Sequence, residues 1–327
     1  MSKIPNVVTI GGGTGSYASL MGLKKYPIKL TAIVNMIDNG GSSGRLRDEL
    51  GVLPPGDVRQ CLVALAESSR LLRELFSYRF EEGGLRGHSF GNIFLSTLEK
   101  QTGSMKKAIA EIGKILRIKG QVVPVTFTKS NLCVDLTDGK TIIGETHIDV
   151  LEKKEKRAKI VKAYLSPVAK INQDAKTAIL YADYILIGPG DLYTSIIPNL
   201  LINGLPVAIK KSKAKKIYVL NLMTKYGQTT NYKASEHVKV LERYLGKNVL
   251  DFILVNSKNP KKKALSWYEE YGEHPVEDNL KSTNYKIIRK DLIKDVMVTK
   301  DKSDELRRSI IRHDSKKLAS EVMNLIS

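Results

Sequence analysis

Short apolar runs alternate along the chain with segments in which apolar residues recur at helical spacing. In the first 117 residues, the apolar runs predict strands at 6–10 and 30–37. The helical spacing predicts helices at 16–25, 57–68, 70–80, 91–100 and 104–117. Strands that alternate with helices are typical of a parallel sheet with crossover helices, and we expect such a sheet here.

The pattern changes between about 120 and 165, where shorter apolar runs follow one another. They lie at 122–127, 132–136 and 141–146, and Thr137-Asp138-Gly139 is a typical turn between the last two. We interpret this stretch as a small antiparallel β insertion at the edge of the main sheet. Alternation then returns, with helices expected at 172–181, 192–203, 234–245, 261–271 and 303–326 and strands at 184–187, 216–221, 249–256 and 285–290. The expected fold class is α/β, a three-layer, Rossmann-like and largely parallel sheet, with residues 1–327 forming a single domain.

Composition is typical of a protein with a full apolar core and no membrane span. The chain has 327 residues, of which 42% are hydrophobic. Its apolar stretches stay well short of the roughly 18 residues that a membrane helix needs. The two cysteines, Cys61 and Cys133, lie far apart in apolar runs and lack metal-binding spacing. Cysteines of this kind are typical of a reducing compartment, so we expect a cytoplasmic protein.

The formal net charge of +19 raises the question of a nucleic-acid partner. Residues 1–99, which hold two of the glycine-rich loops described next, carry 11 Lys and Arg against 9 Asp and Glu. The basic surplus therefore lies mainly in later helices and loops. Aromatic residues make up only 6% of the chain and do not alternate with lysines as in base-stacking surfaces. We interpret the charge as solvated surface and consider nucleic acid an unlikely partner.

Three glycine-rich loops follow three of the expected strands. They are Gly11-Gly12-Gly13-Thr14-Gly15, Asp38-Asn39-Gly40-Gly41-Ser42-Ser43-Gly44 and Gly188-Pro189-Gly190-Asp191. Glycines let backbone N–H groups approach an anion closely, and the N-terminus of a following helix carries partial positive charge. The three loops together predict one crevice that holds a phosphorylated ligand.

The first loop fits neither of the common nucleotide motifs. After Gly11 and Gly13, the dinucleotide fingerprint requires a glycine where Ser16 stands, and the Gly-Lys-Ser/Thr of a P-loop is missing. Asp38 ends the second strand, where it can bind a ribose, hold a Mg²⁺ that bridges phosphates, or cap its own turn. The residues leave these three roles open.

Other polar residues that can contact the ligand lie close to expected helix starts. They are Arg45, Asp57, His88, Asn92, Thr194, Ser195 and Asn199. Asp57 can equally cap the helix that starts at Val58, and Arg45 can lie on a solvated helix face. The sequence has no Ser-His-Asp or Cys-His arrangement that would indicate a covalent nucleophile.

These segments resemble the bacterial YvcK family, also called the gluconeogenesis factor family, in the superfamily of the 2-phospho-L-lactate transferase CofD. The resemblance covers nearly the whole chain and rests on ordered motifs. They are the first two glycine loops, Pro54-Pro55-Gly56-Asp57, Gly87-His88-Ser89-Phe90-Gly91-Asn92, Gly188-Pro189-Gly190-Asp191-Leu192-Tyr193-Thr194-Ser195 with Pro198-Asn199-Leu200, Asn221-Leu222-Met223-Thr224, Tyr268 ahead of Glu273-His274-Pro275-Val276, and Arg312-His313. Two positions depart from the family pattern: Asn39 stands where an aspartate is usual, and His274 precedes Pro275.

The resemblance implies a regulator that binds a UDP-sugar such as UDP-N-acetylglucosamine and supports cell shape and wall synthesis during gluconeogenic growth. It also implies that Tyr268 stacks on the uracil and that Arg312, expected inside the last helix, binds the diphosphate. The alternative is a Mg²⁺-dependent transferase that moves a phospho-acyl group from a nucleotide diphosphate carrier, with Asp38 as a metal ligand. The protein partner and self-association stay open.

Overall fold

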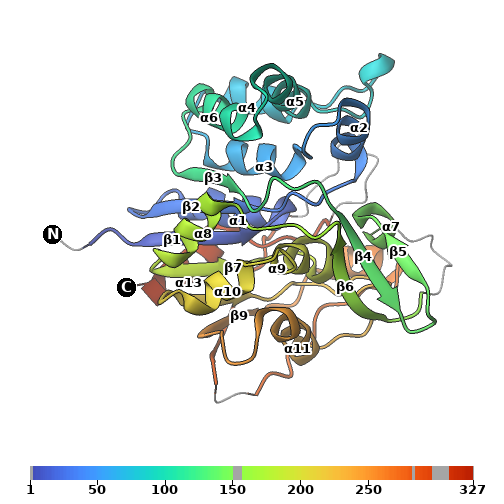
Figure 1. Ribbon diagram of the computed structural model, residues 1–327. Coiled ribbons are helices and arrows are strands. Elements are labelled where there is room, and N and C mark those ends of the chain that lie inside the picture. Colours follow the sequence, from blue (N-terminus) through green and yellow to red (C-terminus); the bar gives the residue numbers. More distant parts are fainter. Residues whose placement is uncertain (1–2, 150–156, 282–283, 297–308, 327) are drawn as a thin grey trace.

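The computed structural model describes residues 3–149, 157–281, 284–296 and 309–326. Its centre is a seven-stranded parallel sheet (Figure 1). The strands are β1 (Asn6–Gly11), β2 (Lys29–Val34), β3 (Gln121–Pro124), β7 (Tyr184–Ile187), β8 (Lys215–Val219), β9 (Phe252–Asn256) and β10 (Lys286–Lys290). The strand order is β10-β9-β8-β7-β1-β2-β3, which confirms the predicted fold class.

The order of the strands places a crevice beside β1. The chain builds outward from β1 to β3 on one side and from β7 to β10 on the other, so the order reverses between β1 and β7. In open α/β sheets, ligands bind outside the carboxyl ends of the strands at such a reversal. The first and third glycine-rich loops leave the sheet at this point.

Helices cover both faces of the sheet. One face is covered by α1 (Gly13–Leu23), α3 (Gly56–Leu65), α6 (Met105–Leu116) and α13 (Ser315–Ile326). Outside them pack α2 (Gly41–Leu50), α4 (Arg70–Ser77) and α5 (Phe90–Thr102). The other face is covered by α8 (Gln173–Leu180), α9 (Ile197–Leu200), α10 (Leu205–Lys211) and α11 (Ala234–Leu245).

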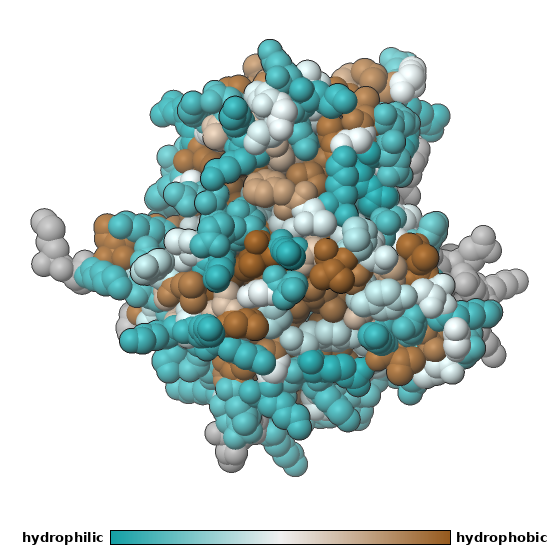
Figure 2. Space-filling view, viewed as in Figure 1, coloured by the Kyte–Doolittle hydropathy of each residue, from teal (hydrophilic) through white to brown (hydrophobic). Residues whose placement is uncertain are grey.

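The central strands β1, β7, β8 and β9 carry near-continuous apolar runs, as is typical of strands covered on both faces, whereas the edge strand β10 is largely exposed. A large apolar core fills both sides of the sheet, and a smaller second cluster lies around α12 (Lys262–Glu269). The visible surface is mainly hydrophilic, with apolar side chains in small separate groups (Figure 2). Among the described residues, we find no helix with the length and apolar character needed to cross a membrane.

The antiparallel insertion exists, but its start was predicted wrongly. It consists of β4 (Asn131–Leu136), β5 (Thr141–Ile143) and β6 (Ile160–Ser166), in the order β5-β4-β6, with α7 (Glu145–Asp149) after β5. The run at 122–127 belongs instead to the main sheet, where β3 pairs parallel with β2. A short apolar run carries no information about the direction in which it pairs, so periodicity could not assign it.

The helices also differ from the prediction, most clearly in three regions. The glycine-serine run is the first turn of α2, where no helix was expected, because Gly44 packs against the Asn39 carbonyl without room for a side chain. The helix expected at 192–203 is a π-helical turn, η2 (Leu192–Ile196), followed by α9, and α10 was missed. The last helix begins at Ser315, not at 303; residues 303–308 lie outside the described part. Arg312 therefore precedes this helix.

Candidate functional site

The crevice at the strand reversal is formed by the first and third glycine loops. A side chain at Gly15 would overlap the carbonyl of Pro189, so the N-terminus of α1 and the loop after β7 touch through their backbones. Gly13 has a φ of +61°, which favours glycine. No side chain caps α1 at Gly12. The start of α1 therefore presents backbone N–H groups to the crevice, as anion-binding sites do.

Asp57 connects the start of α3 to the start of α1. Its Oδ1 accepts a hydrogen bond of 2.8 Å from the Gly13 N–H, although the two residues are far apart in sequence. A side chain at Gly12 would overlap the same carboxylate. Asp57 thus lies in the first turn of α3 but accepts a hydrogen bond from a backbone N–H at the start of α1. This is a more specific role than the cap of its own helix considered from the sequence.

A polar cavity of about 120 Å³ opens beside this contact. Its walls are the starts of α1, α2 and α3, the loop before η2, and α7 of the insertion. Its lining includes Gly13, Thr14, Asp38, Gly40, Ser42, Ser43, Asp57, Arg59, Arg79, Asn92, Glu145, Asp149, Asp191, Thr194, Ser195, Lys225 and Ser309. The structure thus brings residues of all three glycine loops, with Asn92, to one cavity.

A chain of buried hydrogen bonds orders one wall of the cavity. Arg59 Nε donates to Asn92 Oδ1 at 2.8 Å, and Asn92 Nδ2 donates to Ser42 Oγ at 3.1 Å. Ser42 Oγ in turn lies 3.1 Å from His88 Nδ1. Because the Ser42 oxygen accepts from Asn92, its own proton can go to the ring nitrogen. His88 is therefore a buried support for Ser42 and does not itself line the cavity.

Several carboxylates also line this cavity, among them that of Glu145. Its Oε2 is buried and has no hydrogen-bond partner among the described residues. Burial, followed by the charges of Asp38, Asp57, Asp149 and Asp191, raises the pKa of Glu145 well above its ordinary value. The charged form of Glu145 is therefore disfavoured relative to that of an exposed glutamate. Lys225 offsets part of this negative charge through an ion pair of 3.2 Å with Asp149.

Asn39, the first departure from the family pattern, does not line this cavity. Its Oδ1 accepts hydrogen bonds from the Thr146 N–H at 3.0 Å and the Thr146 hydroxyl at 3.3 Å. Asn39 thus fastens α7 to the end of β2. An aspartate at position 39 could accept the same hydrogen bonds, so either residue can hold α7 against the end of β2.

A second, smaller cavity of about 70 Å³ adjoins the first on the side of β8. Both cavities share Thr14, Asp191, Ser195 and Ser309. The smaller one is closed by Gly12, Gly15, Gly190, Asn221, Arg312 and His313. Asn221 Nδ2 donates to Asp191 Oδ1 at 2.9 Å, which fixes this carboxylate at the start of η2. The structure thus places Arg312 beside the glycine loops.

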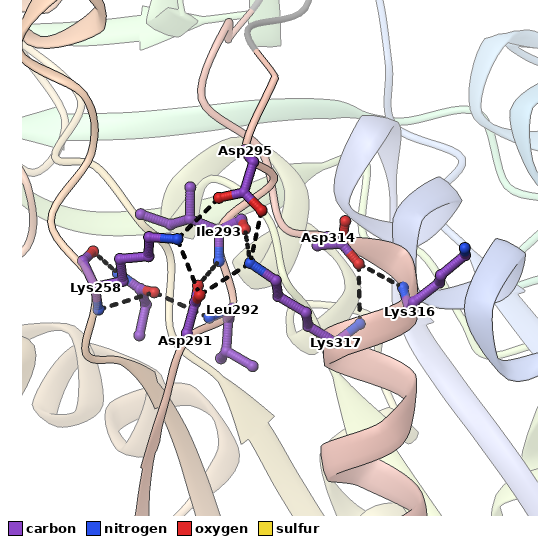
Figure 3. Close-up of polar contacts among 9 residues, drawn as sticks. Lys258, Asp291, Leu292, Ile293, Asp295, Asp314, Lys316 and Lys317 are labelled. Atoms are coloured by element: carbon purple, nitrogen blue, oxygen red, sulfur yellow. Dashed lines mark hydrogen bonds and ion pairs between the residues drawn. The ribbon is translucent and has the colours of Figure 1, made fainter.

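An ion-pair network holds the segment that carries Arg312 (Figure 3). Lys258 and Lys317 each contact both Asp291 and Asp295 at 2.8–3.2 Å. Lys317 Nζ also donates to the Ile293 carbonyl, and Asp314 Oδ1 accepts from the N–H groups of Lys316 and Lys317. Ile293 and His313 pair in antiparallel fashion. The network thereby fixes residues 311–314 against the sheet.

Tyr268 and Asn199 are also absent from the lining of both cavities, but each bonds to a residue that belongs to it. Tyr268 is only 2% exposed and packs in the cluster around α12. Its hydroxyl accepts hydrogen bonds from the N–H groups of Ile310 and Ile311 at 3.1 and 3.2 Å. This placement favours a role in holding the Arg312 segment over stacking on a base. Asn199 is fully buried, and its Nδ2 donates to the Ser195 carbonyl at 2.9 Å.

Sequence reasoning missed several lining residues. Glu145, Asp149 and Lys225 come from the insertion and from the loop after β8, neither of which carries a glycine motif. Arg59 and Arg79 were not among the predicted site residues either. Arg45, a candidate, is not part of the cavity lining and donates to the Arg86 carbonyl at 3.0 Å. A buried carboxyl group in a turn-rich insertion has no signal in a single sequence.

Carboxylate oxygens are the ligands that Mg²⁺ prefers, so the lining fits this ion in type. Among the described residues, however, no group of three or more His, Cys, Asp or Glu is arranged to hold a metal. A Mg²⁺ that keeps its waters and is held by one or two carboxylates together with ligand phosphates is compatible with this arrangement.

An open α/β sheet with glycine loops at the strand reversal defines a protein of the nucleotide-binding, doubly wound class. Comparison with known families is more specific. The model of the family "2-phospho-L-lactate transferase CofD" matches residues 7–293, and the chain belongs to this CofD family. The resemblance seen in the sequence is thereby confirmed.

Relatives within this family carry the name gluconeogenesis factor, which places the chain among the gluconeogenesis factors. The one from Bacillus subtilis is 38% identical over 327 residues, covering 100% of this chain and 99% of its own. The one from Halalkalibacterium halodurans is 43% identical over 275 residues, 84% of each chain. The crystal structure of a UPF0052 family member from Bacillus halodurans covers 99% of this chain and all of its own, with a TM-score of 0.89 and 38% identity.

Proposed function

We propose that the chain binds a UDP-sugar, with UDP-N-acetylglucosamine as the best candidate, in the two adjoining cavities. The observation that carries this proposal is the start of α1 at the strand reversal, which has no side-chain cap from its own N-cap residue Gly12 and lies between two cavities that share Thr14, Asp191 and Ser195. A diphosphate at this helix start has N–H donors, hydroxyls and the Arg312 guanidinium within the same walls. The nucleoside and the sugar then extend into the two cavities on either side.

The carboxylates in the larger cavity would repel a diphosphate unless a cation or a proton compensates them. Burial and the neighbouring carboxylates raise the pKa of Glu145, which disfavours its charged form, and Arg59, Arg79 and Lys225 supply positive charge in the same lining. A Mg²⁺ bound together with the phosphates would supply the rest. We therefore expect UDP-sugar binding to be tighter in the presence of Mg²⁺.

In this proposal the protein is a cytoplasmic regulator whose state depends on the concentration of a cell-wall precursor, the UDP-sugar, during gluconeogenic growth. The names of its relatives support the link to gluconeogenesis. Support of cell shape and wall synthesis through a protein partner is part of the same proposal. In solution, calorimetric titration with UDP-N-acetylglucosamine, GDP and NAD, each with and without Mg²⁺, tests it: binding of the UDP-sugar alone supports it, and binding of NAD alone refutes it.

The gathering of carboxylates favours a second candidate function, a Mg²⁺-dependent phospho-acyl transferase. Asp38 lines the larger cavity and accepts a hydrogen bond of 2.7 Å from the Gly40 N–H. A metal on this side would neutralise charge that develops at phosphorus. The matched family model is named for such a transferase. If the protein turns over a nucleotide diphosphate carrier, Asp38→Asn should abolish turnover while its melting temperature stays near that of the parent.

A further inference from the structure

His313 lines the smaller cavity, and one of its ring nitrogens has no hydrogen-bond partner among the described residues. The side chain is 6% exposed, and Nε2 is buried without a hydrogen bond among the described residues. The ring also forms a hydrogen bond with the Leu220 backbone. A buried polar atom without a partner costs free energy, so such atoms are uncommon in native proteins. At a cavity wall, the missing partner is most simply a group of the ligand.

The contact with Leu220 decides what kind of group this is. A backbone carbonyl only accepts, so the ring nitrogen facing Leu220 donates its proton. Because Nε2 is the nitrogen without a partner, Nδ1 is the donor. A neutral imidazole carries only one N–H, and Nε2 is therefore an acceptor. The cavity accordingly offers a hydrogen-bond acceptor next to the donors at the start of α1.

We propose that the cavity closed by Arg312 and His313 is a subsite for a sugar hydroxyl, which donates a hydrogen bond to His313 Nε2. This inference rests on the proposed function, since it assigns one end of the UDP-sugar to this side of the diphosphate. The cavity volume of about 70 Å³ accommodates a hydroxyl and its carbon atom. While the ring stays neutral, an ionised phosphate offers Nε2 no proton, so a hydroxyl is the better partner at this position.

The position of His313 is set from two sides. Ile293 pairs with its backbone, and the Lys258–Asp291–Asp295–Lys317 network holds Ile293 (Figure 3). Tyr268 holds Ile310 and Ile311 just ahead of it. The acceptor is thus preorganised, which is a condition for discrimination between ligands that present a hydroxyl and ligands that do not.

The test compares the affinities of three variants for UDP-N-acetylglucosamine and for UDP. His313→Leu removes the acceptor, and we expect Kd for the UDP-sugar to rise about tenfold, the equivalent of ~1.4 kcal/mol. His313→Gln returns an amide oxygen near the position of Nε2 and should bind within about threefold of the parent. His274→Leu changes an exposed histidine outside both cavities and should bind as the parent does.

Titration with UDP shows whether the hydroxyl belongs to the ribose or to the hexose. If the ribose donates it, His313→Leu weakens UDP and the UDP-sugar equally; if the hexose donates it, only the UDP-sugar is weakened. Parental affinity in His313→Leu, or equal losses in the Leu and Gln variants, overturns the inference while the proposed function stands. Failure of the parent protein to bind any UDP compound overturns the proposed function itself.

The parent protein provides a measurement that does not depend on folding of the variants. The ¹⁵N resonance of a neutral imidazole nitrogen responds to a hydrogen bond on its lone pair. Addition of UDP-N-acetylglucosamine should shift the His313 Nε2 signal and leave that of Nδ1 nearly unchanged. An Nε2 signal that stays in place at saturation contradicts the inference.

Discussion

Acid should destabilise the protein through two buried histidines, and His237 allows the cleaner test. This side chain of α11 is fully buried, and neither ring nitrogen has a hydrogen-bond partner among the described residues. Burial lowers the pKa of His237 from 6.5 to about 4. Burial likewise lowers the pKa of His313 to about 4. Both rings are therefore neutral in the folded protein at pH values where the unfolded chain takes up protons.

The sign and size of the effect follow from this difference. Because the folded pKa is depressed, the stability contribution is fully present above pH 6.5 and is lost as the pH falls toward 4. The full difference from 6.5 to about 4 corresponds to about 3 kcal/mol for each ring. Between pH 7.5 and 5, the loss is about 2 kcal/mol for each ring.

His237→Leu removes one of these protonation sites and replaces a polar ring that has no partner. Urea unfolding at pH 7.5 and 5.0 should show a decline in unfolding free energy that is about 2 kcal/mol smaller in the variant than in the parent. His147→Gln, at an exposed position of α7, is the matched control and should leave the parental decline unchanged. An equal decline in parent and His237→Leu would refute the reasoning, because it would mean that the ring titrates alike in both states.

Three further outcomes follow from particular contacts. Glu145→Gln should stabilise the ligand-free protein increasingly as the pH rises above 4.5, since the raised pKa of Glu145 makes its ionisation in the fold unfavourable. Urea unfolding at pH 5 and 8.5 measures the difference in unfolding free energy between variant and parent, and a difference that does not grow with pH contradicts the expectation. Gly15→Ala should lower the unfolding free energy by ~1–3 kcal/mol, because the added methyl group would overlap the Pro189 carbonyl. Gly84→Ala is the control: its methyl group would point into open space, and it should change the unfolding free energy by less than ~0.5 kcal/mol. Equal effects of the two substitutions would show that the loops adjust freely. Tyr268→Phe should cost ~1–3 kcal/mol because two N–H groups lose their acceptor, and weaker UDP-sugar binding without any loss of stability would instead favour the stacking role.

The sequence was informative where a pattern is local. The parallel strands, buried on both faces, appear as apolar runs, and the first and third glycine loops follow β1 and β7 as predicted. The start of α2 was missed because glycine and serine have low helix propensity, although tertiary packing against Asn39 overrides it. Glu145 and Lys225 reach the cavity only through the arrangement of the insertion and of the loop after β8.

Long-range placement explains the remaining differences. Tyr268 on α12 is predicted to stack on a base, and its hydroxyl bonds with residues more than 40 positions away, which the sequence did not indicate. Arg312 was expected on a helix, yet it lies in an irregular segment held by Ile293 and by the lysine and aspartate network. No periodicity in a single chain reports such pairings, because they depend on which segments meet in space.

The most direct test of the central claim is a calorimetric titration of the ligand-free protein with UDP-N-acetylglucosamine in the presence of Mg²⁺, with NAD titrated in parallel. The account predicts saturable binding of the UDP-sugar at one site per chain, weakened about tenfold by His313→Leu, and no binding of NAD at the same concentrations. Saturable binding of NAD without any heat from the UDP-sugar would contradict it.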